Sequence, residues 1–430
     1  MPSVPQMDDD DPHRLSILPA IVRHHLDDAS TQHTTRKFLV SAPHLNLRLL
    51  RRHDDRLAAH LDGVAVAGDD KHTICEVALQ SGGAGAAFVT TVQALEDRDR
   101  AFLQKLLTLC DTDLSRRSGM LAAFGWIERS QLQGVVRELL LSTSTFERFA
   151  GVAACSMHRV DPGLGPARRL EDPDPLVRAR AYRAAGELGM REFVSRLGSA
   201  TRDEDPACQF WAAWSAVLLG DRRDGLEFLR AAALQDGPFR SRAFALALLT
   251  MSEQVGHAYL RPLAQDPALL RWLVKGVGIV GDPTYVPWLL RYMEDDRLAR
   301  LAGESFTLIT GLDLSRPPFE RARPDNFESG PNDDPADENV AMDEDEGLPW
   351  SDVRQVQAWW NQNGGRFAAG VRHFMGAPVK REHCIDVLTN GYQRQRIAAA
   401  HHLCLLSPGQ TLFEWRAPAW RQQRLLAQMS

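Results

Sequence analysis

Hydrophobic and polar positions recur with a helical period along most of the chain, and a larger pattern returns about every thirty residues between 174 and 311. Each copy opens with an acidic or turn-forming group and continues into a run rich in alanine and leucine. The openers are Asp174-Pro175, Asp205-Pro206, Asp236-Gly237-Pro238, Asp266-Pro267 and Asp295-Asp296, with spacings of 31, 31, 30 and 29 residues. A period of this size indicates stacked helix pairs. The sequence therefore predicts an all-α fold organised as an α-solenoid.

The copy at residues 175–189 shows the expected packing of one unit. Val177, Ala181, Ala184 and Leu188 share one helix face, and small residues on that face let paired helices approach closely. Several copies end at a glycine, which permits the left-handed turn that closes a helix. These glycines are Gly189, Gly220, Gly281 and Gly311. One such pair cannot bury its apolar face alone, so neighbouring pairs must stack on both sides.

The repeats divide the chain into regions. Less regular copies precede the clear ones, at 118–141 and 146–170, so the array is expected to begin near residue 115. The N-terminal helices are expected over 17–26, 36–39 and 45–61, with a break at Asp62-Gly63. The predicted regions are a disordered tail (1–12), a helical N-terminal region (13–114), the repeat array (115–314), an acidic, proline-rich linker (315–350) and a C-terminal helical region (351–430).

Charge is unevenly distributed. The chain carries a formal net charge of −6, and residues 325–346 hold ten acidic residues and no basic one. Without that stretch the rest amounts to −6 + 10 = +4, too little to predict a nucleic-acid track. The acidic run is expected either to be an extended, self-repelling linker or to fold on a basic partner.

Candidate chemistry is sparse. Six widely spaced cysteines without a C-x-x-C pair indicate free thiols and a cytoplasmic protein. No secretory signal and no membrane helix is expected. The glycine-rich stretch 81–85 lacks the lysine of a P-loop, and the pairs His24-His25 and His401-His402 lack the spacing of metal ligands. We therefore expect no catalytic residue, no cofactor and no metal, and a protein that is not an enzyme.

Arginines and tryptophans are the candidate partner-binding residues, because both are enriched at the energetic centres of protein interfaces. Packing between repeats is the alternative role for the tryptophans. The candidates are Arg178, Arg180, Arg183, Trp211, Trp214, Arg240, Arg300, Glu304, Trp350, Trp359 and Trp360.

The Asp-Pro opener, an arginine four residues later (Asp174/Arg178, Asp236/Arg240, Asp296/Arg300) and the terminal glycine resemble the bacterial HEAT-like repeat over residues 115–311. Segments such as 299–314 and 348–360 also resemble an uncharacterised bacterial family of helical-repeat proteins, often encoded near type VI secretion genes. That resemblance implies an adaptor or chaperone for a secreted effector, or an immunity protein against one. A further resemblance is to HEAT-like alkylpurine DNA glycosylases, whose aromatic and carboxylate set does not map onto this sequence.

These observations together predict a protein-binding scaffold. We expect another protein as the partner, held on the concave face of the solenoid, with no membrane partner and with nucleic acid disfavoured. An immunity protein and a glycosylase-type enzyme are the alternatives, and the sequence leaves the oligomeric state open.

Overall fold

A computed structural model describes residues 18–68, 71–161, 163, 166–325, 327–330 and 342–429. The predicted disordered tail and residues 331–341 of the predicted linker lie outside this range. Contacts divide the chain into two compact units, one formed by residues 1–35 and 53–127 and the other by residues 36–52 and 128–430. Each unit is described separately below.

The described residues of the first unit form helices. They are α1 (Pro19–Leu39) and α2 (Leu47–Ala65), whose adjoining ends belong to the second unit, and α3 (Lys71–Ser81), α4 (Ala84–Glu96), α5 (Arg100–Cys110) and α6 (Leu114–Trp126). The prediction of a separate helix at 36–39 is wrong, because these residues extend α1. The predicted break at Asp62-Gly63 is also wrong, because α2 continues to Ala65. Gly63 instead permits close packing: a Cβ there would lie 2.7 Å from the His25 ring.

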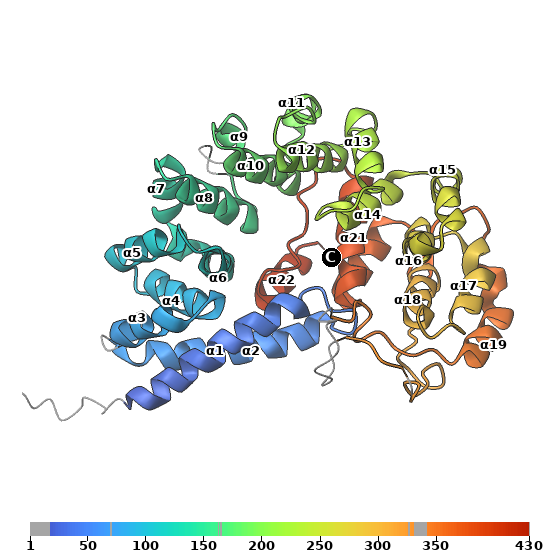
Figure 1. The fold of residues 1–430 in the computed structure, drawn as a ribbon, viewed down its shortest axis with the longest axis horizontal. Helices are drawn as coiled ribbons and strands as arrows, with labels where there is room; N and C mark the ends of the chain where they lie inside the picture. Colours follow the sequence, from blue (N-terminus) through green and yellow to red (C-terminus); the bar gives the residue numbers. More distant parts are fainter. Residues whose placement is uncertain are drawn as a thin grey trace, which may run out of the picture. The chain divides into compact units, whose positions relative to one another are not determined.

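The second unit is a row of helix pairs followed by a C-terminal region (Figure 1). The row contains α7 (Val135–Leu141), α8 (Thr145–Met157), α9 (Pro166–Arg169), α10 (Pro175–Leu188), α11 (Val194–Ala200), α12 (Pro206–Leu218), α13 (Asp224–Ala232), α14 (Arg240–Thr250), α15 (Glu253–Leu260), α16 (Leu270–Val280), α17 (Val286–Tyr292) and α18 (Ala299–Thr310). The C-terminal region contains α19 (Val353–Asn363), β1 (His373–Phe374), β2 (Ala377–Pro378), α20 (Arg381–Asn390), α21 (Gln393–Leu406) and α22 (Ala419–Leu426). Within this row the even-numbered helices form the inner layer and the odd-numbered helices the outer layer (Figure 1). The predicted all-α architecture of HEAT-like helix pairs is confirmed.

Three of the five openers act as helix caps, and the glycines end the helices as predicted. The Asp205 carboxylate accepts a 2.8 Å hydrogen bond from the Cys208 N–H at the start of α12, and Asp174 and Asp266 cap in the same way. Such a cap contributes about 1 kcal/mol. Gly189 and Gly281 follow α10 and α16 with φ of 74° and 73°, the left-handed conformation that glycine adopts without strain.

Neighbouring inner helices pack closely through the predicted small residues. Val177, Ala181 and Ala184 of α10 are fully buried. A Cβ at Gly186 of α10 would lie 2.4 Å from the Ser215 hydroxyl oxygen of α12, so only glycine fits at this contact. The sequence pattern of one repeat thus determines how closely it approaches the next.

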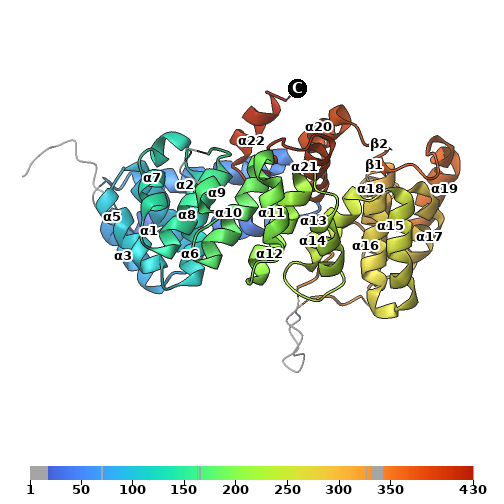
Figure 2. The same cartoon turned by 90° about the horizontal axis from the view of Figure 1, so that it is seen from above.

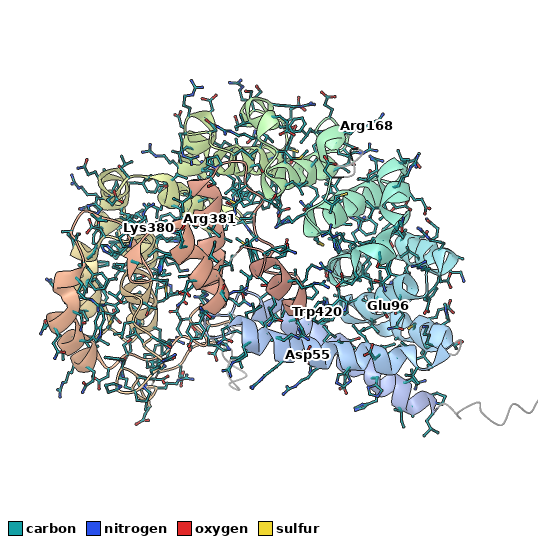
Figure 3. All side chains as sticks on the ribbon, turned by 180° about the vertical axis from the view of Figure 1, so that it is seen from behind. Asp55, Glu96, Arg168, Lys380, Arg381 and Trp420 are labelled. Atoms are coloured by element: carbon teal, nitrogen blue, oxygen red, sulfur yellow. The ribbon has the colours of Figure 1, made fainter. Side chains whose placement is uncertain are left out.

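Residues 367–417, which we call the C-terminal segment, pass over the C-terminal ends of the inner helices. In Figure 2 this segment lies along one edge of the row of helices in the second unit. The His373 N–H donates a 2.8 Å hydrogen bond to the Gly281 carbonyl, and the Leu412 N–H donates a 3.0 Å bond to the Glu187 carbonyl. Figure 3 labels Lys380 and Arg381, where the segment enters α20.

An arginine of the C-terminal segment closes α14, an inner helix that lacks a glycine cap. Helix α14 ends at Met251 in an extended conformation. The Arg372 guanidinium donates to the carbonyls of Leu248, Leu249 and Met251 at distances of 3.0, 2.7 and 2.8 Å. The C-terminal segment therefore supplies hydrogen bonds that the end of α14 cannot make within itself.

Among the described residues, the helices are too short or too polar to traverse a lipid bilayer.

Candidate protein-binding surface

In the repeat that opens at Asp174, the predicted arginine at the fifth position joins that repeat to the next one. Arg178 of α10 forms a two-point ion pair with Asp203, with nitrogen–oxygen distances of 3.1 and 3.0 Å. Asp203 in turn accepts a 3.0 Å hydrogen bond from the N–H of Asp205, the cap of α12. Burial alone would raise the pKa of Asp203, but the Arg178 hydrogen bond lowers it. The side chain of Arg178 is thus used within the chain.

The same junction occurs one repeat earlier. Arg148 of α8 pairs with Asp172 at 2.9 and 3.0 Å, and Asp172 accepts a 3.1 Å bond from the N–H of Asp174. Arg148 and Asp172 escaped the sequence analysis because the opener of that copy is Ser144 rather than aspartate. We call this arrangement, an arginine on an Asp-x-Asp turn, the Asp-x-Asp junction.

Arg180 belongs to a buried ionic network and does not reach the surface. It is 9% exposed and lies 3.1 Å from the Glu187 carboxylate. Ser156 donates a 2.5 Å hydrogen bond to the same carboxylate, and Arg183 lies 2.8 Å from it. Burial would raise the pKa of Glu187, but Arg183 and Arg180 lower it well below its ordinary value. This carboxylate therefore stays charged and holds the two arginines of α10 in place.

A second group of predicted residues gathers with side chains from the C-terminal segment on the inner side of the row, where α21 packs against α12 and α14 (Figure 1). We call this group the Arg–Trp face. Its members are Arg183, Trp211, Trp214, Arg242, His401, Trp415 and Arg416.

Ring contacts join the members of the Arg–Trp face. The Arg183 guanidinium lies 4.5 Å from the Trp211 ring, and the Trp211 and Trp214 rings are 5.4 Å apart. His401 of α21 lies 6.1 Å from Trp214 and 5.6 Å from Trp415. A continuous series of aromatic rings thereby connects α12 with α21, and the Arg183 guanidinium joins α10 to it.

The Arg–Trp face has more cationic and donor groups than acceptors. Arg242, 5.9 Å from the Trp211 ring, and Arg416, 5.8 Å from the Trp415 ring, are exposed. Neither pairs with a carboxylate among the residues that the structure describes. The buried indole N–H of Trp415 likewise has no acceptor there.

Mutual repulsion adds to this imbalance. Although both side chains reach solvent, the surrounding protein lowers the pKa of Arg242, and the positive charges of Arg183 and Arg416 lower it further. The surrounding protein also lowers the pKa of the solvent-accessible Arg416; Glu414 opposes this effect and Arg183 adds to it. An incoming carboxylate would relieve this repulsion.

The remaining candidates lie farther along the row. Arg300 of α18 pairs with Asp343 and lies 4.9 Å from the ring of Trp350, which is 8% exposed. Glu304 of α18 pairs with Arg394 at 3.1 Å. Arg240 lies over Trp272, at 4.4 Å.

The predicted tryptophan cluster at the end of the linker is split. Trp359 and Trp360 are half-buried against Phe306, at 6.0 and 6.4 Å, whereas Trp350 packs on Arg300. The contacts of these three tryptophans are therefore explained by packing within the chain, the alternative role that we gave for the tryptophans.

The linker prediction needs correction where the structure describes this stretch. Of the two expectations for the acidic run, the self-repelling linker is wrong here, because Asp343, Glu344 and Asp345 lie against α16 and α18 and pair with cations. Folding on a basic partner is closer, but the cations belong to the chain itself. The inner side of the row also differs from the open surface that we expected, because α21 packs there over α12 and α14.

Comparison with known proteins agrees with the repeat pattern. No curated protein and no solved structure matches the chain. Residues 167–250, which run from α9 through α14, match a family described as HEAT repeats. The part of the array that carries Arg183, Trp211, Trp214 and Arg242 is therefore similar to HEAT repeats.

Proposed function

We propose that this chain is a protein-binding scaffold that holds an acidic segment of another protein on the Arg–Trp face. The observation that carries the proposal is the pair of exposed guanidinium groups, Arg242 and Arg416, that lack carboxylate partners among the described residues. Helical-repeat arrays suit extended partners because their surface is built from repeated, similar elements. Tryptophan beside arginine suits a segment with both acidic and apolar side chains.

Charge reversal tests this proposal. We expect Arg242→Glu with Arg416→Glu to lower retention of the partner at least tenfold in a pull-down from the native host, followed by titration with the identified protein. The matched control is Arg223→Glu with Arg291→Glu, which changes the net charge equally at exposed positions of the outer layer. A partner that binds the reversed variant as tightly as the control variant would refute the proposal.

The partner class that we favour is a secreted effector of a type VI secretion system, with the chain as its adaptor or chaperone. The support is the resemblance of segments 299–314 and 348–360 to a family often encoded near such genes. An immunity protein is the alternative within this proposal. Co-expression with toxins from neighbouring genes separates the two, because only an immunity protein restores growth.

A DNA-acting enzyme remains the alternative of a different class. It would show salt-sensitive binding to duplex DNA. Reversal of Arg178 and Arg183 would disturb their pairs with Asp203 and Glu187 as well, so Arg242→Glu is the cleaner variant for this test. The proposed scaffold predicts that the chain binds its protein partner in the presence of excess duplex DNA.

A further inference from the structure

We call the stretch from Met342 to Trp350 the acidic strap. Part of it has the same sequence as a junction between two repeats. Residues 343–345 read Asp-Glu-Asp, as do residues 203–205 at the junction of α10 and α12. Arg300 stands four residues after Asp296, as Arg178 stands four residues after Asp174. Helix α18 is the last inner helix of the row, so no further repeat supplies a junction to Arg300.

The geometry repeats as well. Arg300 contacts both oxygens of Asp343, at 2.7 and 3.1 Å, as Arg178 contacts both oxygens of Asp203. Asp343 accepts a 3.0 Å hydrogen bond from the N–H of Asp345, the same bond that Asp203 accepts from Asp205. Arg300 approaches with its two terminal nitrogens, whereas Arg178 uses Nε and one terminal nitrogen. The strap thus lies on Arg300 of α18 where the junction of a following repeat would lie.

Helix α16 adds two cations to this contact. Arg271 lies 2.8 Å from Asp345, and Lys275 lies 3.2 Å from Glu344. Glu344 remains 67% exposed and Arg271 36% exposed, so water reaches the outer pairs, whereas the Asp345, Asp343 and Arg300 side chains are 5%, 12% and 7% exposed. Solvent-exposed ion pairs are weak and are screened by salt. The outer pairs can therefore open more readily than the largely buried Arg300–Asp343 pair, beside which Leu348 and Trp350 of the strap are also buried.

We propose that α16 and α18 carry a docking site for Asp-x-Asp turns, which the chain's own strap occupies and for which the Asp-x-Asp turn of a partner protein competes. Arg300 recognises the first aspartate, Arg271 the second, and Lys275 the acidic residue between them. Because the strap is tethered, its effective concentration is on the order of millimolar, and a partner must exceed it. The proposal does not depend on the Arg–Trp face.

Competition between strap and peptide is the test. The probe is a fluorescein-labelled peptide with the sequence of residues 342–350, and its control carries asparagine in place of both aspartates. The full chain with Asp343→Asn and Asp345→Asn should bind the probe at least tenfold more tightly than the wild type does. Adding Arg271→Ala should weaken that binding tenfold, whereas adding Arg291→Ala, on the exposed surface of α17, should not change it.

Failure of the probe to bind the folded double-asparagine variant, or equal binding of the asparagine peptide, would overturn the proposal. If the double-asparagine variant does not fold, amide hydrogen exchange measured on the wild-type protein is the test. Excess unlabelled peptide should speed exchange of the Asp345 and Leu348 amides, which are hydrogen-bonded within the strap. Unchanged exchange at millimolar peptide would equally overturn it, and neither result bears on the Arg242 and Arg416 variants.

Discussion

The backbones of Gly281 and His373 are in direct contact. The His373 N–H donates a 2.8 Å hydrogen bond to the Gly281 carbonyl, and a Cβ at Gly281 would lie 2.3 Å from the His373 carbonyl oxygen. The glycine that ends α16 is thus needed twice, for its left-handed φ and for the passage of the C-terminal segment.

Gly281→Ala should therefore destabilise the protein by more than the conformational cost alone. The left-handed conformation costs a non-glycine residue about 1 kcal/mol, and the clash with His373 adds to it, for a total of about 2–4 kcal/mol. Urea unfolding measures the change. Gly198→Ala in α11 is the control, because a Cβ there meets no atom within 4 Å. It should raise the free energy of unfolding by about 0.5–1 kcal/mol, since alanine favours a helix. Equal effects of the two substitutions would argue against the contact.

Arg178→Ala should weaken the junction between α10 and α12. The substitution leaves the Asp203 carboxylate, whose side chain is 11% exposed, without its two-point partner. We expect a loss of about 2 kcal/mol in the free energy of unfolding. Arg196→Ala removes an ion pair with Glu171 in which both side chains are exposed. This substitution should lower the free energy of unfolding by less than about 0.5 kcal/mol. Similar losses in the two variants would show that the Asp-x-Asp junction is not specially stabilising.

The protein should lose stability as the pH falls below neutrality, because His402 is buried in its neutral form. Burial, together with the smaller electrostatic effects of Arg372, His401 and His383, lowers the pKa of His402 to about 3. Below the ordinary histidine pKa of about 6.5 the unfolded chain binds a proton that the folded chain excludes. The stabilisation is complete above that pH and is lost as the pH falls from about 6.5 towards 3. At pH 5 the loss should reach about 2 kcal/mol.

Thermal unfolding between pH 7.5 and 5 tests this expectation. His402→Leu should flatten the pH dependence, whereas His24→Gln should not, because the His24 side chain is 75% exposed. An unchanged slope in His402→Leu would assign the acid sensitivity to other groups.

All six cysteines should be unreactive in the folded protein. They are buried and unpaired, and burial raises the pKa of Cys155 and Cys404 to about 12. Because the thiolate is the reactive form, a disulfide reagent at pH 8 should modify less than one thiol per chain under native conditions and all of them in denaturant. Rapid modification of the native protein would contradict this burial.

The local part of the fold could be predicted from the sequence. Asp205 acts only at the start of α12, and Gly189 acts only at the end of α10. Their residue types therefore indicate the cap and the left-handed turn directly. The small residues of α10 likewise predict its buried face. These features depend on neighbours a few positions away, where sequence periodicity is informative.

The long-range contacts could not be predicted in this way. Arg242 and Arg416 meet only because the C-terminal segment folds back onto the row, and no periodic pattern indicates that return. The place of the strap could not be predicted for a related reason: its carboxylates repel one another in isolation, and the cations that pair with them lie on α16 and α18. The sequence does hold one signal for this contact: residues 203–205 and 343–345 both read Asp-Glu-Asp.

The passage of the C-terminal segment across the helix ends has a consequence for the size of the array. Helical-repeat rows in general can gain or lose a unit, because each unit contacts only its neighbours. Here Gly189 meets Gly409 and Gly311 meets Met375, so one covalent stretch is attached near both ends of the row. Inserting a unit between α12 and α16 would move these attachments apart by roughly 10 Å, the spacing of packed helices. The length of residues 376–408 and the number of units between α10 and α18 can therefore change only together.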